Sequence, residues 1–247
     1  FPMEKLNNNK LEAITVAINY SDYLELTLPE NVGYFDNYNI LTIKEDKETI
    51  NLCNKYGANC IIIDNPFGKN NFEFDKGYVI QEGLRNLKFF DWVLLLDADI
   101  ILPFNFRKLL ESNFPEANTL YGASRCFAWD YNEYLQFKNK EKKIDDFYKI
   151  EGGWGCGYFS LFNLNSYKIK NISINKLYPN GNEESDMVLL EGFHPKRIDV
   201  GKLDFNVLHL GGPSLFWKGR FNGKERFDEI KNKKFKDLPN TKELLNL

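Results

Sequence analysis

Histidine and cysteine are scarce in this chain, whose 247 residues include two histidines and four cysteines. The cysteines lie at positions 53, 60, 126 and 156, and no two of them form a C-x-x-C pair. Zinc clusters and disulfide frameworks need closely spaced sets of these residues, so we expect neither. Scattered free thiols are typical of a reducing compartment, and we therefore expect a cytoplasmic protein.

Long apolar runs and a charge excess of one sign are missing as well. No uninterrupted apolar segment reaches the roughly 20 residues of a membrane-spanning helix, so no span is expected, while attachment at the membrane periphery stays open. The 32 basic and 35 acidic residues leave a net charge of -3, which argues against nucleic acid as a partner. Internal repeats and low-complexity linkers are also lacking, so residues 1–247 are predicted to form one domain.

The chain does have enough apolar residues for a sizeable core, at 43% hydrophobic and 15% aromatic. Its first part alternates short apolar segments with amphipathic ones. Strands are predicted at 11–19, 39–43, 58–64 and 93–96, and helices at 23–28, 45–56 and 76–87, the first of them interrupted by Pro29. This alternation predicts an α/β fold with a mostly parallel central sheet.

The second part is less regular, and a mixed arrangement is expected there. A helix is predicted at 103–110 and a strand at 119–127, followed by a polar stretch at 131–147 that is helical or mobile. Glycines cluster at 152–157 before a short apolar strand, and glycine lets a backbone approach a ligand closely. A helix over 182–190 that opens with acids and becomes apolar, and a strand beginning at Val207, are predicted next. The charged stretch 218–247 is expected to be peripheral.

The predicted strand at Val93–Leu96 ends in two carboxylates, Asp97 and Asp99. In an extended chain these two side chains share one side, because side chains alternate with period two. Unpaired charge is costly to bury, and a divalent cation such as Mg²⁺ or Mn²⁺ would compensate it and also bind phosphates. The motif therefore predicts a metal–diphosphate site, and the alternative is a loop whose acids face water.

The segment Trp92–Ile100, which reads WVLLLDADI, resembles the D-x-D strand of glycosyltransferases with the GT-A fold, above all the inverting family 2. A glycine-rich strand, an acidic helix start and a histidine before Gly-Gly follow in the family's order, so the likeness runs from Ile14 to Trp217. It implies a Rossmann-like sheet flanked by helices, with residues 1–103 as the nucleotide-binding half. Residues 104–217 would form a smaller, mixed acceptor-binding half.

The activity that this resemblance implies is metal-dependent, inverting sugar transfer from a nucleotide-sugar donor. UDP is the expected nucleotide and Mn²⁺ or Mg²⁺ the expected cofactor, and the acceptor would be a hydroxyl of a glycan, a lipid-linked saccharide or a protein. Asp99 and His209 would bind the metal, and Asp97 would contact the ribose or reach the metal through water. His209 resembles the family's last metal ligand, which precedes a mobile loop, here Gly211–Gly219; a satisfied core histidine is the alternative.

The catalytic base is expected in the segment 182–187, which resembles the family's E-D-x-D-L helix start. Glu184 takes the place of the family's catalytic aspartate, and Asp186, the second acid, is the other candidate. The base would deprotonate the acceptor hydroxyl for attack opposite the diphosphate, which inverts the anomeric carbon. Acids in a first helical turn also serve simply to favour the helix dipole.

Nucleotide contacts are expected where the predicted strands end, although ordinary turn chemistry explains the same residues. Lys76 lies in a D-K-G segment that resembles the family's N-K-G segment, and Gly153 and Trp154 are expected at the acceptor, since an indole offers a sugar a stacking face. Trp154 in the core is the alternative. The expected donor contacts are Asn19, Tyr20, Thr42, Glu45, Asp46, Lys76 and Asp97.

Two other functions compete with sugar transfer. A sugar-nucleotide nucleotidyltransferase needs a glycine-rich phosphate loop with a basic residue after the first strand, and residues 19–23 hold neither. A non-catalytic protein that binds sugars or nucleotides would keep the metal strand and lack the base.

Overall fold

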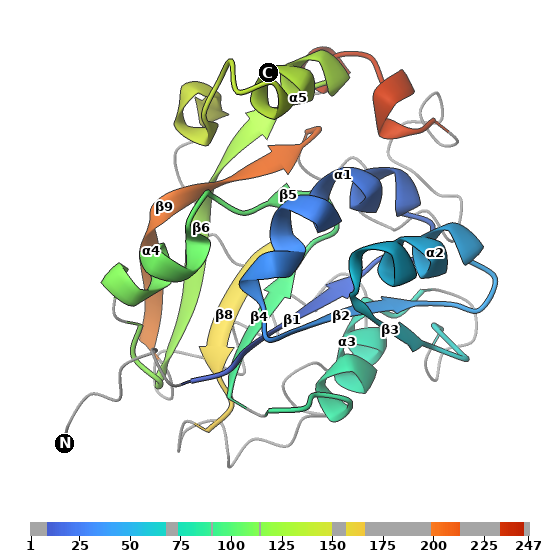
Figure 1. Ribbon diagram of the computed structural model, residues 1–247, viewed down its shortest axis with the longest axis vertical. Helices are drawn as coiled ribbons and strands as arrows, with labels where there is room; N and C mark the ends of the chain where they lie inside the picture. The colour runs from blue at the N-terminus through green and yellow to red at the C-terminus, as the bar shows by residue number, and fades with distance from the viewer. Residues whose placement is uncertain are drawn as a thin grey trace.

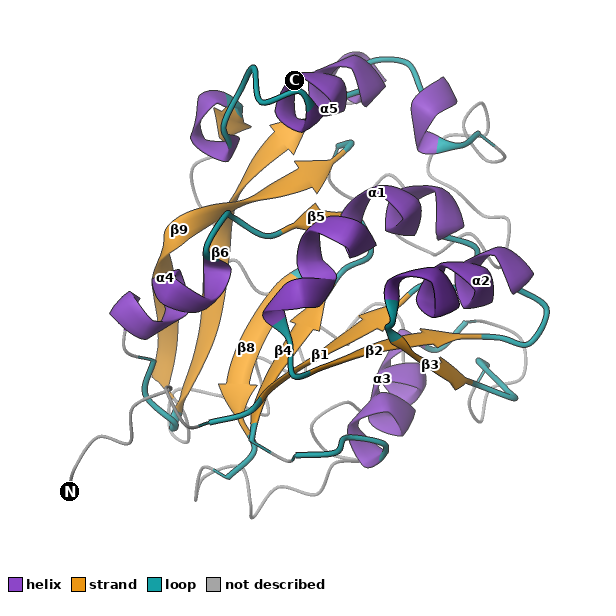
Figure 2. Ribbon diagram, viewed as in Figure 1, coloured by secondary structure: helices purple, strands orange, loops and turns teal. Residues whose placement is uncertain are grey.

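The computed structural model describes residues 9–67, 74–89, 91–113, 115–149, 157–165, 199–212 and 233–244. A nine-stranded sheet runs through the molecule, in the order β3-β2-β1-β4-β8-β6-β9-β5, with β7 paired to β6 (Figure 1). Helices flank this sheet, so the predicted α/β class is confirmed (Figure 2).

The first half of the sheet is parallel. It consists of β1 (Leu11–Val16), β2 (Asn37–Thr42), β3 (Asn59–Ile62) and β4 (Trp92–Leu96), each paired in parallel with its neighbour. Side chains of α1 (Ser21–Asn31) and α2 (Lys47–Tyr56) share one apolar cluster with these strands, and α3 (Lys76–Arg85) shares another. Successive strand residues face opposite sides, so the two clusters mark the two covered faces that the apolar strands predicted.

The second half is mixed, as expected. Strand β8 (Phe159–Asn163) is antiparallel to β4 and to β6 (Thr119–Ala128), which is parallel to β9 (Asp199–Leu210). The remaining elements are β5 (Ile100–Ile101), β7 (Tyr148–Lys149), α4 (Phe106–Asn113), α5 (Tyr131–Lys138), α9 (Thr241–Leu244) and the 3-10 turns η2 (Val32–Tyr34), η3 (Ile144–Asp146) and η5 (Phe235–Asp237).

Helix α2 shows why local sequence signals succeed in the parallel half. Asp46 caps its start by accepting a hydrogen bond from Thr49 N at 3.2 Å, and Gly57 ends it in the left-handed conformation with φ 75°. Both are standard helix-end devices, and glycine takes this φ without a steric penalty. The predicted end at Gly57 is confirmed.

The predicted interruption at Pro29 is wrong, because α1 runs through this residue to Asn31. The buried Asn31 side chain donates to Ile100 O at 2.7 Å and accepts from Leu102 N at 2.9 Å. Proline removes one backbone donor, but these tertiary hydrogen bonds anchor the last turn, so the helix continues.

The stretch 218–247 was expected to be peripheral, and its described residues 233–244 contradict this. Phe235 is fully buried, with its ring centroid 5.0 Å from that of Tyr23, and its N–H donates to Asp22 Oδ2 at 2.7 Å. Thr241 is also buried and donates to Trp129 O at 2.5 Å. The segment is charged overall, so its composition gave no sign of the few side chains, such as Phe235 and Thr241, that are buried in the core.

Over the described ranges, no helix is long and apolar enough to cross a bilayer. Cys53, Cys60 and Cys126, the cysteines in the described part of the chain, are free thiols.

Candidate active site

The two carboxylates of the D-A-D sequence lie in a tight turn between β4 and β5. Asp97 N donates to Tyr158 O at 3.0 Å, Ile100 N to Asp97 O at 3.3 Å, and Leu210 N to Asp99 O at 2.9 Å. The turn is thereby tied to the start of β8 and to the end of β9.

Buried polar side chains hold this turn from behind. Thr15 Oγ1 donates to Leu96 O at 2.7 Å, Thr27 Oγ1 to Ala98 O at 2.8 Å, and Asn31 Nδ2, as noted above, to Ile100 O. Thr27 and Asn31 are four residues apart on α1 and so share one helix face. No sequence motif marks them, and they fix the backbone that carries Asp97 and Asp99.

Asp99 and His209 meet because β5 pairs with β9. Ile100 and His209 are partners in that antiparallel ladder, and Asp99 Oδ2 lies 3.8 Å from His209 Nε2. His209 is 5% exposed, and its Nδ1 lies 3.0 Å from Gly211 O. A carbonyl oxygen only accepts, so Nδ1 carries the proton and Nε2 offers its lone pair toward Asp99.

Burial lowers the pKa of His209 to about 3, and the positive charge of Arg125 lowers it in the same direction. The imidazole is therefore neutral at physiological pH, the form in which histidine binds a metal. A backbone carbonyl that fixes the ring through its other nitrogen is the usual support of a metal-binding histidine.

Asp97 and Lys76 form the second pair of the site. Lys76 is the first residue of α3, and its Nζ lies 3.0 Å from Asp97 Oδ1. The Lys76 side chain is 27% exposed and the Asp97 side chain 35%, so both remain accessible to a ligand. The D-K-G segment and the D-A-D sequence were predicted as separate donor contacts, and the fold brings them together.

Arg125 on β6 belongs to the same site, although its sequence context gave no signal. Its guanidinium carbon lies 4.3 Å from the ring centroid of Tyr158 and 5.1 Å from that of Phe127. Burial lowers the pKa of Arg125, while the charges of Tyr158, Asp99 and Asp97 act in the opposite direction. Phe127 pairs with His209, and Arg125, two residues earlier, shares that face of the strand.

The residues expected to contact the nucleotide follow β1 and β2, whose carboxyl ends lie at the same edge of the sheet as that of β4. Asp46 is 7% exposed and joins these loops, since its Oδ2 accepts from Asn19 N at 2.7 Å and from Thr42 Oγ1 at 3.0 Å. Asp46 thus positions the loops, and its contact with a nucleotide stays a prediction.

The other two expected contacts at this edge differ in exposure. The Glu45 side chain is 63% exposed and lies 3.7 Å from Lys44. Tyr20 is partly buried, with its ring centroid 6.0 Å from that of Tyr23. Asn19 is exposed and takes a left-handed φ of 61°, which the sharp turn after β1 requires.

Four predicted site residues lie outside the described residues: Glu184, Asp186, Gly153 and Trp154. Within the described ranges, no group of three or more histidine, cysteine, aspartate or glutamate side chains could hold a metal ion. The described part of the chain therefore offers Asp99 and His209 as a pair of candidate ligands.

Comparison with known proteins identifies the fold. No protein-family model matches the chain, and no curated protein matches it. Glucosyl-3-phosphoglycerate synthase from Mycobacterium tuberculosis is similar in structure at 14% sequence identity. In complex with Mn²⁺, UDP-glucose and phosphoglyceric acid it aligns with a TM-score of 0.52 over 84% of this chain and 74% of its own. The structure of the same enzyme with Mn²⁺, UDP and phosphoglyceric acid aligns with a TM-score of 0.51, over 84% of this chain and 73% of its own.

A mycobacterial protein gives a TM-score of 0.50 at 12% identity, over 82% of this chain and 66% of its own. This chain thus spans between 66% and 74% of the length of the three structures. The chain has the GT-A fold that the D-x-D resemblance implied.

Proposed function

We propose that the protein is a metal-dependent glycosyltransferase that moves a sugar from a nucleotide-sugar, with UDP as nucleotide, to a hydroxyl group. The observation that carries the proposal is the meeting of Asp99 and His209, 3.8 Å apart, beside the Lys76–Asp97 pair at the carboxyl end of β4. In open α/β sheets this edge is where ligands bind.

The residues present fit a divalent cation. A neutral imidazole nitrogen and a carboxylate oxygen face each other, and two acceptors at this distance favour a cation between them. Asp99 and His209 would hold it. A carboxylate suits both Mg²⁺ and Mn²⁺, whereas the imidazole favours Mn²⁺, because Mg²⁺ prefers oxygen ligands. When bound, such an ion neutralises the charge that develops on a leaving diphosphate.

Similar structures support this assignment of donor and metal. Glucosyl-3-phosphoglycerate synthase with the same fold binds UDP-glucose together with Mn²⁺. In this chain Lys76 and Arg125 add two positive charges near the D-A-D turn, and positive charge orients and stabilises a diphosphate. We therefore extend the proposal to a UDP-sugar and to a hexosyl group.

We propose an inverting reaction with Glu184 or Asp186 as the base that deprotonates the acceptor hydroxyl. Gly153 and Trp154 would border that acceptor, which we place among glycans, lipid-linked saccharides and proteins. The similar enzyme binds phosphoglyceric acid, so a small hydroxy acid belongs in the acceptor screen. A non-catalytic sugar- or nucleotide-binding protein is the second candidate, and a nucleotidyltransferase is disfavoured because residues 19–23 lack its glycine-rich loop.

The donor proposal is tested by thermal unfolding with UDP, GDP, CMP and dTDP, each with and without Mn²⁺. A ligand that binds only the native state stabilises it by mass action, and at about 100 times its Kd it should raise the melting temperature by about 5 °C or more. We expect this shift with UDP and only when Mn²⁺ is present.

Substitution of Asp99 locates the effect. Asp99→Asn should abolish the Mn²⁺-dependent shift, whereas Asp237→Asn, at an exposed position of η5, should keep it. Melting curves that no nucleotide changes, with or without Mn²⁺, would contradict the proposal.

The base is tested separately, by the release of UDP from UDP-sugars in the presence of acceptors. Replacing the true base, by Glu184→Gln or Asp186→Asn, should slow transfer by about 10² to 10⁴-fold, because a positioned base contributes this much. The UDP- and Mn²⁺-dependent thermal shift should survive both changes. Undiminished turnover in both variants would contradict the assignment of the base. Nucleotide binding without any turnover in the unmodified protein would favour a non-catalytic binding protein.

A further inference from the structure

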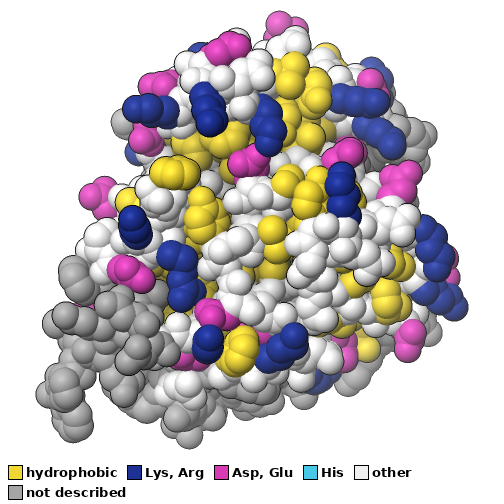
Figure 3. Space-filling view, in the orientation of Figure 1, with side chains coloured by type: hydrophobic (Ala, Val, Ile, Leu, Met, Phe, Trp, Pro, Cys, Tyr) yellow, Lys and Arg dark blue, Asp and Glu magenta, His cyan; other side chains and the backbone are white. Residues whose placement is uncertain are grey.

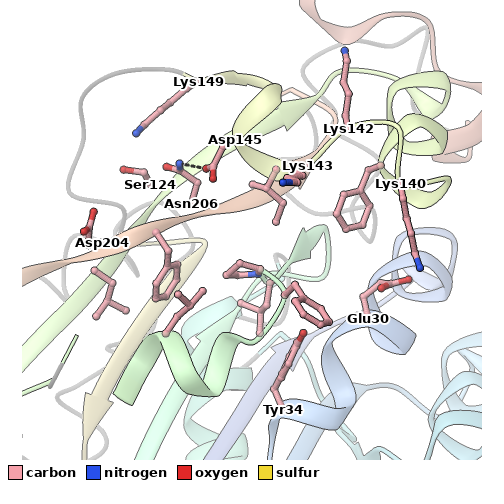
Figure 4. A pocket seen from close by; sticks show the side chains of 18 of the residues that line it. Glu30, Tyr34, Ser124, Lys140, Lys142, Lys143, Asp145, Lys149, Asp204 and Asn206 are labelled. Atoms are coloured by element: carbon pink, nitrogen blue, oxygen red, sulfur yellow. Dashed lines mark hydrogen bonds between the residues drawn. The ribbon is translucent and has the colours of Figure 1, made fainter. Parts of the chain in front are cut away.

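A cavity of about 1280 Å³ lies apart from the D-A-D turn. It is lined by the end of α1, the segment that follows β5, α4, one side of β6 and β9, and the stretch from α5 to β7 (Figure 4). We call this cavity the rear groove. The residues that line it are described in full, and none of them is a predicted site residue.

The rear groove and the candidate active site share no residue. Ser124 and Asn206 are partners in that ladder, and both line the rear groove. Arg125, the next residue, instead packs on Tyr158 and Phe127 beside His209. Neighbouring strand residues face opposite sides, so Ser124 lines the rear groove while Arg125 lies at the candidate active site.

Charge in the rear groove has the opposite sign to that of the chain. Six lysines and three acids line it, whereas the whole chain carries a net charge of -3. Two of the acids are already engaged, since Glu30 accepts from Lys138 at 2.5 Å and Asp145 from Asn206 at 2.5 Å. The groove therefore presents positive charge to any ligand.

Polar side chains gather mainly on one wall of the groove. Figure 4 shows Lys143, Lys149, Ser124 and Asn206 along the upper wall, and hydrocarbon side chains together with Glu30 and Tyr34 along the lower one, while Lys142 points away from the cavity. Figure 3 shows apolar side chains at the surface between α4 and the α5 segment, with lysine or arginine side chains around them. The apolar lining includes Leu102, Phe104, Leu109, Leu203 and Phe205.

Phe104 gives the strongest sign of an apolar ligand. Its side chain is 83% exposed, the highest value among the exposed large hydrophobic residues of the described chain. A large apolar side chain next to an apolar wall and a positively charged rim favours a ligand with a hydrocarbon part and an anionic head.

We propose that the rear groove binds one anionic lipid, with its phosphate at Lys143 and Lys149 and its hydrocarbon chain against Phe104 and the lower wall. A half-enclosed cavity of this volume admits a lipid chain. A partner helix, about 10 Å wide, would instead need an open trough. Sugars and free nucleotides lack the apolar part that this wall would cover. This site is independent of sugar transfer.

The probe for the experiment is a short-chain phosphatidic acid, used as monomers with the full chain in a metal-free buffer. Binding is measured by isothermal titration, with inorganic phosphate and a short-chain phosphatidylcholine as comparison ligands. We expect phosphatidic acid to bind at least tenfold more tightly than either, since only it combines the phosphate monoester with hydrocarbon. UDP with Mn²⁺ should not displace it.

Variants place the ligand in the rear groove. Lys143→Gln with Lys149→Gln should weaken binding by on the order of tenfold, because each lysine near an anionic lipid head contributes several-fold. Lys44→Gln with Lys88→Gln, two exposed lysines outside the groove, is the matched control and should change nothing. Phe104→Ser should weaken binding of phosphatidic acid, and its exposed position should leave the melting temperature unchanged.

Three results would overturn the proposal. Equal affinity for inorganic phosphate would show a simple anion site, and displacement by UDP with Mn²⁺ would place the lipid phosphate in the active site. Binding that neither the lysine pair nor Phe104 affects, or no binding at all, would leave the groove to another ligand, such as an acidic peptide. Each of these results is compatible with sugar transfer, so the two proposals fail separately.

Discussion

At the scale of single residues, the candidate active site is defined by how charges are paired. Lys76 pairs with Asp97 at 3.0 Å, and His209 faces Asp99 at 3.8 Å. Arg125 lies near both carboxylates and is partly buried against two aromatic rings. A fixed guanidinium here acts in two directions, because it repels a metal ion and attracts a diphosphate.

Replacing Arg125 by glutamine should therefore separate metal binding from nucleotide binding. Without this positive charge the two carboxylates should bind Mn²⁺ alone more tightly, while UDP with Mn²⁺ should bind about tenfold more weakly. Isothermal titration of Mn²⁺, and then of UDP at saturating Mn²⁺, measures both quantities.

Arg107→Gln is the matched control for Arg125→Gln. Arg107 lies 3.5 Å from Asp36 in a surface pair and should affect neither affinity. A purely structural role of Arg125 would instead weaken both kinds of binding together, and that result would contradict the electrostatic interpretation.

At the scale of elements, helix ends and helix faces place the loops of the candidate active site. Asp46 and Gly57 delimit α2, and Asp46 also ties the loops after β1 and β2 together. Thr27 and Asn31 turn one face of α1 into a support for the D-A-D turn. These elements thus bring the loops and the carboxylates to one edge of the sheet.

The left-handed end of α2 provides a sharp test of backbone conformation. A Cβ at Gly57 would meet no atom within 4 Å, but its φ of 75° disfavours any side chain. Gly57→Ala should therefore lower the free energy of unfolding by about 1 kcal/mol, from backbone strain alone. Urea denaturation followed by circular dichroism measures the change.

Gly33→Ala is the control for the same measurement. A Cβ at Gly33 also meets nothing within 4 Å, and this residue does not have a left-handed φ. The substitution should be neutral or stabilising by up to about 1 kcal/mol, because alanine restricts the unfolded chain. An equal loss of unfolding free energy in both alanine variants would contradict the interpretation that the left-handed φ of Gly57 causes the destabilisation.

At the scale of the whole molecule, the described C-terminal residues close the fold over its N-terminal helix. Phe235 contacts Tyr23 of α1, and Thr241 bonds to the chain just after β6. Residues more than 200 positions apart thus share one apolar cluster, which also includes Ile101 and Leu208 from the strands that join Asp99 to His209.

Phe235→Ala should accordingly destabilise the whole molecule by about 3 to 5 kcal/mol, the usual cost of emptying a buried aromatic site. Phe104→Ala, at a side chain that is 83% exposed, should change the unfolding free energy by no more than about 0.5 kcal/mol. Equal stability of the two variants in urea would restore the expectation that residues 218–247 are peripheral.

Local signals in the sequence predicted the parallel half of the sheet and the place of Asp97 and Asp99 at the end of its fourth strand, whereas the turn that carries them became visible in the fold. The spacing of apolar residues indicates the strands and helices, and Asp46 and Gly57 mark the ends of α2. Such local signals suffice to predict elements that pack against neighbours close in sequence. The same signals predicted a break at Pro29, which the tertiary hydrogen bonds of Asn31 overrode.

Which side chains meet at the site depends on the tertiary structure. His209 reaches Asp99 through the β5–β9 pairing, and Arg125 joins them through the register of β6 with β9. Strand register between distant segments depends on which apolar faces pack together, and no single segment encodes it. The sequence could therefore name Asp97, Asp99 and His209, whereas the place of Arg125 and the packing of Phe235 required the fold.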